Sequence, residues 1–385
     1  MEVDMKRRWL MASLLILVFT FAQAQDALKV GFIYVGPVGD AGWTYAHDLG
    51  RLATMEALPE IETVIVESVS EADVEPFIDQ LVADGVEVIF ATSFGYGDGV
   101  LAAAERYPNV IFGHATGIQR APNVMTYIAD FYQVYYLNGL IAGALTESNK
   151  LGYIAAFPIP EIKRHINAFA LGAREINPDA TVEVRWLFNW FDPAGAKEAT
   201  EALIAEGADV FAFSEDTPTV IQTAGERGFP SYTHYASMLD FSPDTVVSGQ
   251  IANWEAIYID FLSGVLDGTY TNENLADLDY FWRLGEDAVE AGAAPGMVIN
   301  PVYEDRLDAH MIDDPEFGEI SVHDLVFARI EQMTKLDPDY EPFTGPLSDR
   351  KGNVVYEDGQ IATIGELLGL QWAAANVAGP WSEEP

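Results

Sequence analysis

The pattern that most constrains this fold begins at Leu28, where short runs rich in β-branched residues start to alternate with amphipathic helical stretches. This alternation predicts a parallel sheet with crossover helices, because tight turns cannot join parallel strands. The first strands are predicted at Leu28–Val35, Glu62–Val69, Val86–Ala91, Val110–Gly113 and Val124–Ile128. Helices are predicted between them at Trp43–Leu58, Val74–Ala83 and Asp98–Arg106. These segments predict one five-stranded α/β lobe.

A long apolar helix predicted over Phe131–Leu145 leads into a second series with the same rhythm. Its strands are predicted at Leu151–Ala156, Thr181–Trp186, Val210–Ser214, Ser231–Tyr235 and Val246–Ile251. Its helices are predicted at Ile162–Ile176, Ala194–Glu206 and Thr219–Arg227. We therefore expect two similar α/β lobes that share a cleft at the carboxyl ends of their strands, where open α/β sheets bind ligands.

The last third of the chain is less regular. A helix is predicted at Trp254–Leu266, a clear one at Val322–Lys335 and a further one at Ile364–Asn376. We assign residues 25–130 and about 247–300 to the N-terminal lobe, and residues 131–246 and about 301–385 to the C-terminal lobe. The ownership of residues 269–385 stays open, since the chain of a hinged protein crosses between lobes more than once.

Residues 1–24 have the pattern of a secretory signal peptide. Lys6, Arg7 and Arg8 precede an apolar run from Trp9 to Phe21, which is shorter than the roughly 20 residues of a membrane-spanning helix. We expect a periplasmic or secreted protein that does not insert in the membrane. An uncleaved N-terminal anchor is the alternative.

Charge and cysteine content exclude several classes of function. The formal net charge of −40 disfavours nucleic acid and anionic lipid as partners, because both require a basic surface. The absence of cysteine excludes disulfides, thiolate metal sites and the acylated cysteine of a lipoprotein. We expect a monomer without a metal or other cofactor.

Motifs for catalysis and for phosphate binding are missing. The chain has neither a G-x-S-x-G elbow nor an H-E-x-x-H pair, and its glycine-rich turns near Gly36 and Gly95 match no phosphate loop. Glu215 and Asp216 are adjacent and so should point apart. We expect a binding protein and not an enzyme.

Aromatic residues gather at the junctions between strands and helices, which rim the predicted cleft. Six such residues are Trp43, Phe94, Tyr132, Trp190, Phe191 and Trp254. Polar residues lie beside them, among them Thr44, Ser93 and Asp216. Flat rings next to a carboxylate or amide suit a planar heteroaromatic ligand or a sugar, although any one ring could be structural.

Five segments in order, GFIYVGPVGDAGWTYAHDLGR (31–51), FGHATG (112–117), FPIPEIKRHINAFALGAREINP (157–178), WFDPAGAKEA (190–199) and PFTGP (342–346), resemble the basic membrane protein family. That family comprises solute-binding proteins of ABC importers related to bacterial purine nucleoside receptors. The resemblance implies a type I periplasmic binding protein fold, with two doubly wound parallel-sheet lobes joined by three hinge crossings. It also implies a ligand held between the lobes and an ABC permease as partner.

The resemblance assigns roles to individual residues. Trp43 matches the aromatic residue that stacks on the purine in the family's early D-x-x-F-N pattern, with Thr44 in place of the asparagine. Trp190 or Phe191 is the expected stacking residue of the second lobe, and Asp216 matches an aspartate of the adenine-binding-like branch. With the remaining aromatic positions, the expected ligand contacts are Trp43, Thr44, Tyr45, Phe94, Tyr132, Trp190, Phe191, Asp216 and Trp254.

The chain also departs from the family pattern. The aspartate and lysine that engage ribose in nucleoside-binding members are absent from Tyr235–Met238 and Ile251–Trp254. Ribose hydroxyls would therefore lack partners, which favours a free purine base, adenine first. A purine nucleoside, another small polar solute, or a role as the sensing module of a signalling receptor remain the alternatives.

Overall fold

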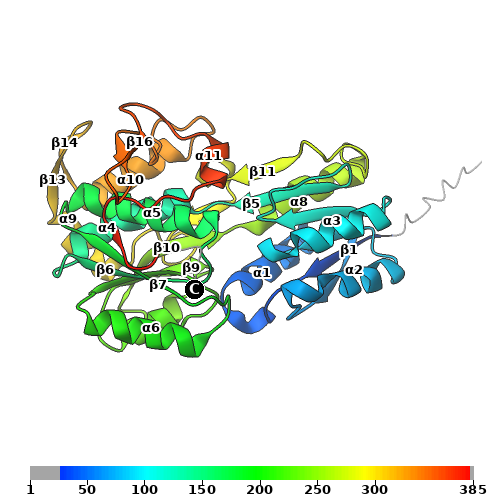
Figure 1. Ribbon diagram of the computed structural model, residues 1–385, viewed down its shortest axis with the longest axis horizontal. Helices are drawn as coiled ribbons and strands as arrows, with labels where there is room; N and C mark the ends of the chain where they lie inside the picture. The colour runs from blue at the N-terminus through cyan, green and yellow to red at the C-terminus, as the bar shows by residue number, and fades with distance from the viewer. Residues whose placement is uncertain (1–26, 382–385) are drawn as a thin grey trace, which may run out of the picture.

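Two separate sheets organise the chain in the computed structural model, which describes residues 27–381 (Figure 1). The six-stranded sheet has the order β11-β5-β4-β3-β1-β2 and the seven-stranded sheet the order β12-β10-β9-β8-β6-β7-β17. Nearly all neighbouring strands run parallel, which confirms the predicted α/β class. The signal peptide predicted at residues 1–24 lies outside the described residues.

The first lobe forms around the six-stranded sheet. Its elements are β1 (Leu28–Ile33), α1 (Trp43–Ala57), β2 (Ile61–Val66), α2 (Val74–Ala83), β3 (Val88–Ala91), α3 (Gly97–Arg106), β4 (Ile111–Ala115), β5 (Val124–Ala129), α8 (Trp254–Asp267) and β11 (Asp279–Trp282). Helices α2 and α3 pack together, as do α1 and α8. Apolar residues of α2 and α3, such as Ile78 and Val100, form a core with Ile33 and Ile89 of the strands.

The second lobe repeats this arrangement around the seven-stranded sheet. Its elements are α4 (Tyr132–Leu145), β6 (Lys150–Ala155), α5 (Pro160–Ile176), β7 (Thr181–Trp186), α6 (Pro193–Ala205), β8 (Val210–Ser214), α7 (Thr219–Gly225), β9 (Ser231–Tyr235), β10 (Val246–Ala252) and β12 (Val289–Ala291). Every residue of α4 is buried, because α5 packs along it and a later helix, α10, also contacts it. Gly139 and Gly172 permit that contact, since a Cβ at either would lie about 2 Å from a carbonyl of the other helix.

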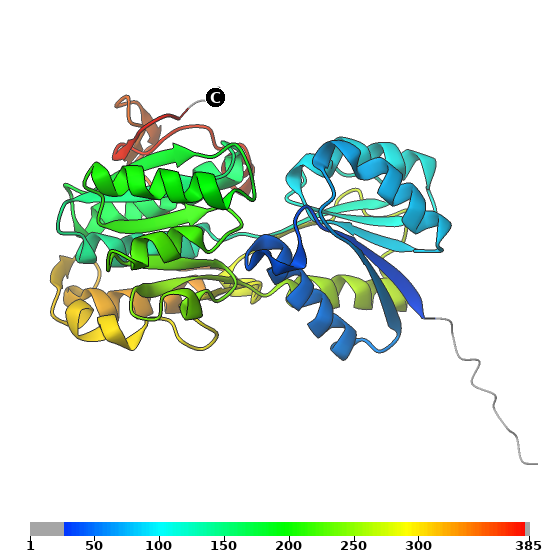
Figure 2. The same cartoon turned by 90° about the horizontal axis from the view of Figure 1, so that it is seen from below.

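The chain passes between the lobes three times, as Figure 2 shows in the middle of the molecule. The first crossing follows β5, the second joins β10 to α8, and the third joins β11 to β12. The chain thus enters the first lobe after Ala252 and leaves it before Val289, a narrower stretch than the expected 247–300. β11 adds a sixth strand to a sheet for which five were predicted.

The C-terminal part covers the second lobe. It comprises α9 (Glu304–Asp308), β13 (Met311–Asp314), β14 (Gly318–Ser321), α10 (Val322–Met333), β15 (Leu347–Ser348), β16 (Val354–Tyr356), α11 (Ile364–Leu368) and β17 (Val377–Ala378). The helix predicted over Ile364–Asn376 is wrong beyond Leu368. Gly369 follows α11, and the Asn167 amide then holds the extended backbone by accepting from the amide of Ala374 and donating to the carbonyl of Trp372.

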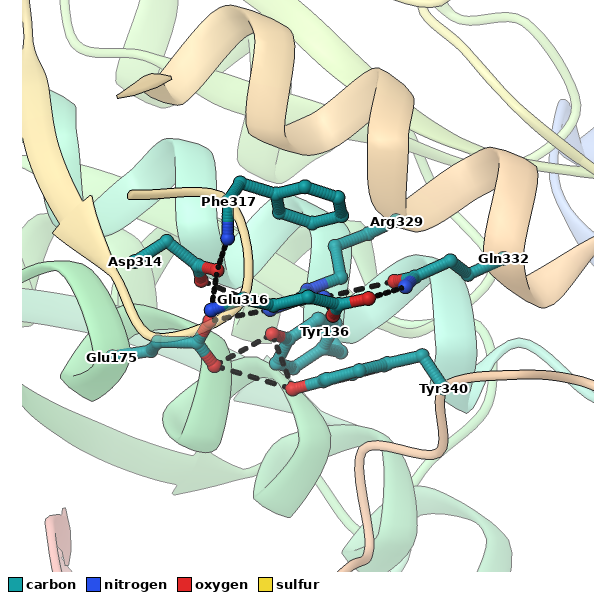
Figure 3. A network of polar contacts seen from close by, with 8 residues as sticks. All are labelled: Tyr136, Glu175, Asp314, Glu316, Phe317, Arg329, Gln332 and Tyr340. Atoms are coloured by element: carbon teal, nitrogen blue, oxygen red, sulfur yellow. Dashed lines mark hydrogen bonds and ion pairs between the residues drawn. The ribbon is translucent and has the colours of Figure 1, made fainter. Parts of the chain in front are cut away.

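A buried arginine fastens this C-terminal part to the lobe (Figure 3). Arg329 of α10 pairs with Asp314 at 3.0 Å and with Glu316 at 2.8 Å. Its guanidinium lies 4.0 Å from the ring centre of Tyr340, whose hydroxyl is 2.7 Å from that of Tyr136 on α4. One charge thereby joins a β-hairpin, a helix and the chain that follows them.

No helix within residues 27–381 is long and apolar enough to cross a bilayer.

Candidate ligand-binding site

A cavity of about 290 Å³ lies between the two lobes. Its lining residues follow the carboxyl ends of strands from both sheets: Val35, Trp43, Ser93, Phe94, Thr116, Glu161, Trp190, Asp216 and Tyr235. A ligand held there would therefore contact both lobes.

Trp43, the first residue of α1, is held in a fixed orientation. Its indole nitrogen donates to the carbonyl of Thr92 at 2.7 Å. The rings of His47, Tyr235 and Trp254 meet the indole nearly edge-on, with centroids 4.4 to 5.2 Å away. A ring braced in this way loses little side-chain entropy when a ligand stacks on it.

Trp190 forms part of the opposite wall and reaches across the cleft. Its indole nitrogen donates to the Glu71 carboxylate at 3.3 Å. The same oxygen accepts from the Ser93 hydroxyl at 2.5 Å and from the amide of Gly95 at 3.0 Å. Glu71 thus connects the Phe94 turn of the first lobe with the aromatic wall of the second.

The lobes also touch directly at Gly42 and Asp216. A Cβ atom placed on Gly42 would lie 2.9 Å from three backbone atoms of Asp216. Together with the Trp190–Glu71 bond and the Trp43–Tyr235 ring contact at 5.1 Å, this contact identifies the conformation as a closed one. Closure of this kind is how hinged two-lobed proteins enclose a ligand.

Two carboxyl groups, Asp216 and Glu161, face the cavity and form no ion pair with any residue from 27 to 381. Asp216 is 2% exposed, and its Oδ1 has no hydrogen-bond partner within residues 27–381. Burial, reinforced by the charges of Asp40 and Glu215, raises the pKa of Asp216 well above its ordinary value. Burial also raises the pKa of Glu161, to about 8. These acids, with the unpaired Thr116 hydroxyl, are the polar groups that a ligand could satisfy.

Backbone conformation also singles out this site. Thr116 and Tyr235 both line the cavity and have positive φ values of 56° and 65°. Positive φ values belong to the left-handed region of backbone conformation, which is unfavourable for β-branched and bulky residues. A residue held there costs on the order of 1–3 kcal/mol. Strain of this kind concentrates at ligand-binding and active sites.

A second cavity of about 490 Å³ adjoins the first and shares Phe94, Thr116 and Glu161 with it. Its other walls include Arg164 and Leu368 of α11. Arg164 is buried and pairs with Asp130 in the first hinge crossing, and it donates to the carbonyl of Leu367 at 2.6 Å. The C-terminal part therefore contributes to the space between the lobes.

The family model of PnrA-like ABC transporter substrate-binding proteins (Bmp) matches residues 27–311. The chain belongs to this family. It is 37% identical to the purine-binding protein of Brucella abortus over 358 residues, which cover 92% of this chain and 94% of the relative. It is 40% identical over 284 residues to a Haloferax volcanii protein named "Putative ABC transporter glucose-binding protein", covering 74% of this chain and 71% of that one.

Solved structures show the same fold. A solute-binding protein of Aeropyrum pernix superimposes with a TM-score of 0.65 at 19% identity, covering 80% of this chain and 91% of that one. A solute-binding protein of Conexibacter woesei gives a TM-score of 0.60 at 20% identity over 80% of this chain and 96% of its own. The expected type I periplasmic binding protein fold is confirmed. Family membership likewise confirms a binding protein and not an enzyme.

Four of the nine expected contact residues line the binding protein's cavity: Trp43, Phe94, Trp190 and Asp216. Tyr45 and Phe191 are instead 37% and 41% exposed. Thr44 is buried, where its hydroxyl oxygen accepts from the amide of Gly36 at 3.2 Å.

Tyr132 and Trp254 are also buried away from the cavity lining. The Tyr132 hydroxyl bonds Glu341 at 2.7 Å, and Trp254 stacks on His47 with a centroid separation of 4.0 Å. Both rings belong to the packing around the hinge and beneath Trp43, so they support the site from behind.

Sequence reasoning missed Glu161, Thr116 and Tyr235 as lining residues. Glu161 could have been found, because Pro160 marks the start of a helix that follows a buried strand, and the first turn of such a helix opens on the cleft. Within residues 27–381 no group of three or more acidic or histidine residues is arranged to hold a metal ion.

Proposed function

We propose that this ABC transporter binding protein captures a free purine base, with adenine preferred. The observation that carries the proposal is the pairing of braced aromatic rings with an unpaired buried carboxyl group in one small cavity. Trp43, Phe94 and Trp190 offer flat apolar surface for the faces of a heteroaromatic ring, and Asp216 can accept from an exocyclic amine. The purine-binding relative at 37% identity supports the same ligand class.

A larger or more polar ligand is the second candidate. The adjoining cavity of about 490 Å³ offers room for a substituent on the base, as in a purine nucleoside. The relative named as a glucose-binding protein makes a sugar the other ligand to test. The base is preferred because four of the nine residues that line the first cavity are aromatic.

The biological setting that we propose is capture outside the inner membrane. The sequence pattern of residues 1–24 supports export, and the family supports delivery to an ABC permease. We propose that the protein acts as a monomer. Since the family's members serve transporters, import is preferred over sensing.

Titration calorimetry and thermal shift with adenine, hypoxanthine, adenosine and glucose test the ligand. We expect adenine to bind most tightly, and Trp43→Ala to weaken it at least tenfold by removing a stacking surface. Tyr45→Ala is the matched control, because Tyr45 is exposed and outside the cavity lining. Binding of glucose or adenosine but not of adenine would refute the proposed base.

A further inference from the structure

We propose that Glu161 binds the ligand as a neutral carboxylic acid, donating a hydrogen bond to a ring nitrogen while Asp216 accepts one from an N–H group. The inference deepens the proposed function and rests on it. It assigns to the site a specificity-determining residue that supplies the donor that the aromatic walls lack.

The position of Glu161 leaves it without a partner in the part of the chain that the structure describes. It lies in the first turn of α5, is 8% exposed and lines both cavities. Its side chain makes no hydrogen bond or ion pair within residues 27–381. A buried carboxyl group with no partner is costly when charged, and it is available to a ligand.

The surrounding charges oppose ionisation of Glu161. Asp130 faces it from the hinge, Asp216 from the end of β8, and the hydroxyls of Tyr153 and Tyr235 from β6 and β9. Arg164, one turn along α5, is the opposing cation, but it is already paired with Asp130. Lys163, the other cation on this turn, donates to Gln371.

Asp216 adds to the accumulation of negative charge. It lies within the influence of Asp40, Glu215, Glu161 and Glu71, and none of the residues lining the first cavity is basic. Two ionised carboxylates in one small cavity would repel each other, so retention of a proton is favoured. The helix dipole of α5 favours the charged form of Glu161, but this effect is weaker than burial.

A neutral carboxyl group has the right pattern for an aminopurine. It presents an O–H donor beside a carbonyl acceptor, and the amidine edge of such a base presents a ring-nitrogen lone pair beside an N–H group. A carboxylate at the same place would repel that lone pair. Since burial raises the pKa of Glu161 to about 8, the neutral form predominates at neutral pH.

Glu161→Gln is the decisive variant, because glutamine keeps the shape and one donor but cannot ionise. We expect its adenine affinity to stay within about threefold of wild type near pH 6.5 and to be constant up to about pH 9. Wild-type affinity should instead fall about five- to sixfold between about pH 8 and 9, and approach tenfold per pH unit above that, the limiting slope of one proton. Comparing the two proteins at each pH cancels the ionisation of adenine itself, and Glu198→Gln on the exposed face of α6 is the matched control.

A measurement without ligand separates this inference from the ligand assignment. The folded-state pKa of Glu161 is raised above its ordinary 4.5, so wild type should lose stability relative to Glu161→Gln as pH rises from about 5 to 8. Above about pH 8 the difference in melting temperature between the two proteins should stay constant. Parallel melting curves, or a tenfold loss of adenine affinity in Glu161→Gln near pH 6.5, would overturn the neutral acid. Failure of every purine to bind would refute only the proposed ligand, and the melting curves would still decide the state of Glu161.

Discussion

Replacing Gly42 with alanine should oppose closure of the lobes without harming either lobe. The new methyl carbon would lie 2.9 Å from the Cα, carbonyl carbon and carbonyl oxygen of Asp216, which are backbone atoms and cannot rotate away. Overpacking of one methyl group costs roughly 1–3 kcal/mol. The cost falls only on the closed state, because Gly42 and Asp216 belong to different lobes. Adenine affinity should therefore fall about 5- to 150-fold.

Calorimetric titration with adenine gives the affinity, and small-angle scattering of the ligand-bound protein reports closure. Gly39→Ala is the matched control, because nothing lies within 4 Å of a Cβ placed there and the same turn carries both glycines. The melting temperature of the ligand-free protein should stay the same in both variants. The closure argument is wrong if Gly42→Ala binds adenine as tightly as wild type. It is also wrong if Gly42→Ala lowers the melting temperature of the ligand-free protein, because the loss of affinity could then come from unfolding.

Two further substitutions test the bond across the cleft and the C-terminal fastening. Trp190→Phe keeps a ring but loses an indole bond worth about 0.5–1.5 kcal/mol, so calorimetry should show a two- to tenfold weaker affinity. The same change at Trp186, whose indole donates to the carbonyl of Pro380 and which does not line the cavity, should leave binding unaltered. Arg329→Met leaves the buried Asp314 carboxylate without its cation. It should lower the free energy of unfolding by about 3–5 kcal/mol in denaturant titrations, with little effect on adenine affinity. Arg106→Met, which breaks exposed ion pairs, should cost much less stability; equal losses in both variants would contradict the role of burial.

Much of the fold could be predicted because its signals are local. The strands at Thr181–Trp186, Val210–Ser214 and Ser231–Tyr235 lie where predicted, since β-branched and aromatic runs are bounded there by turn residues. β11 and β17 were missed because they are short and are defined by distant partners. Similarly, the backbone after α11 is held by Asn167, about two hundred residues away in sequence, so no local pattern reveals it.

The residues of the candidate site also fall into two groups, those that local sequence predicts and those that it does not. Trp43 could be predicted from its place at a strand-to-helix junction, but Tyr45 lies two residues later on the same helix and so projects from a different face. Phe191 directly follows Trp190 in the loop between β7 and α6 and is exposed to solvent. The environment of Glu161 depends on residues distant in sequence, because Asp130 pairs with Arg164 and so occupies the cation that is nearest along α5.

The last strand of the larger sheet, β17, has a consequence for the behaviour of the protein in concentrated solution. Val377 and Ala378 pair with Val182 and Glu183 of β7, so the outer edge of that sheet is a strand of only two residues. Without this cover, every second residue of β7, TVEVRW, would offer unpaired backbone groups to another chain, because the others already pair with β6. Edge strands of that length are templates for aggregation. β17 thus acts as a cap that protects the sheet from joining with its copies.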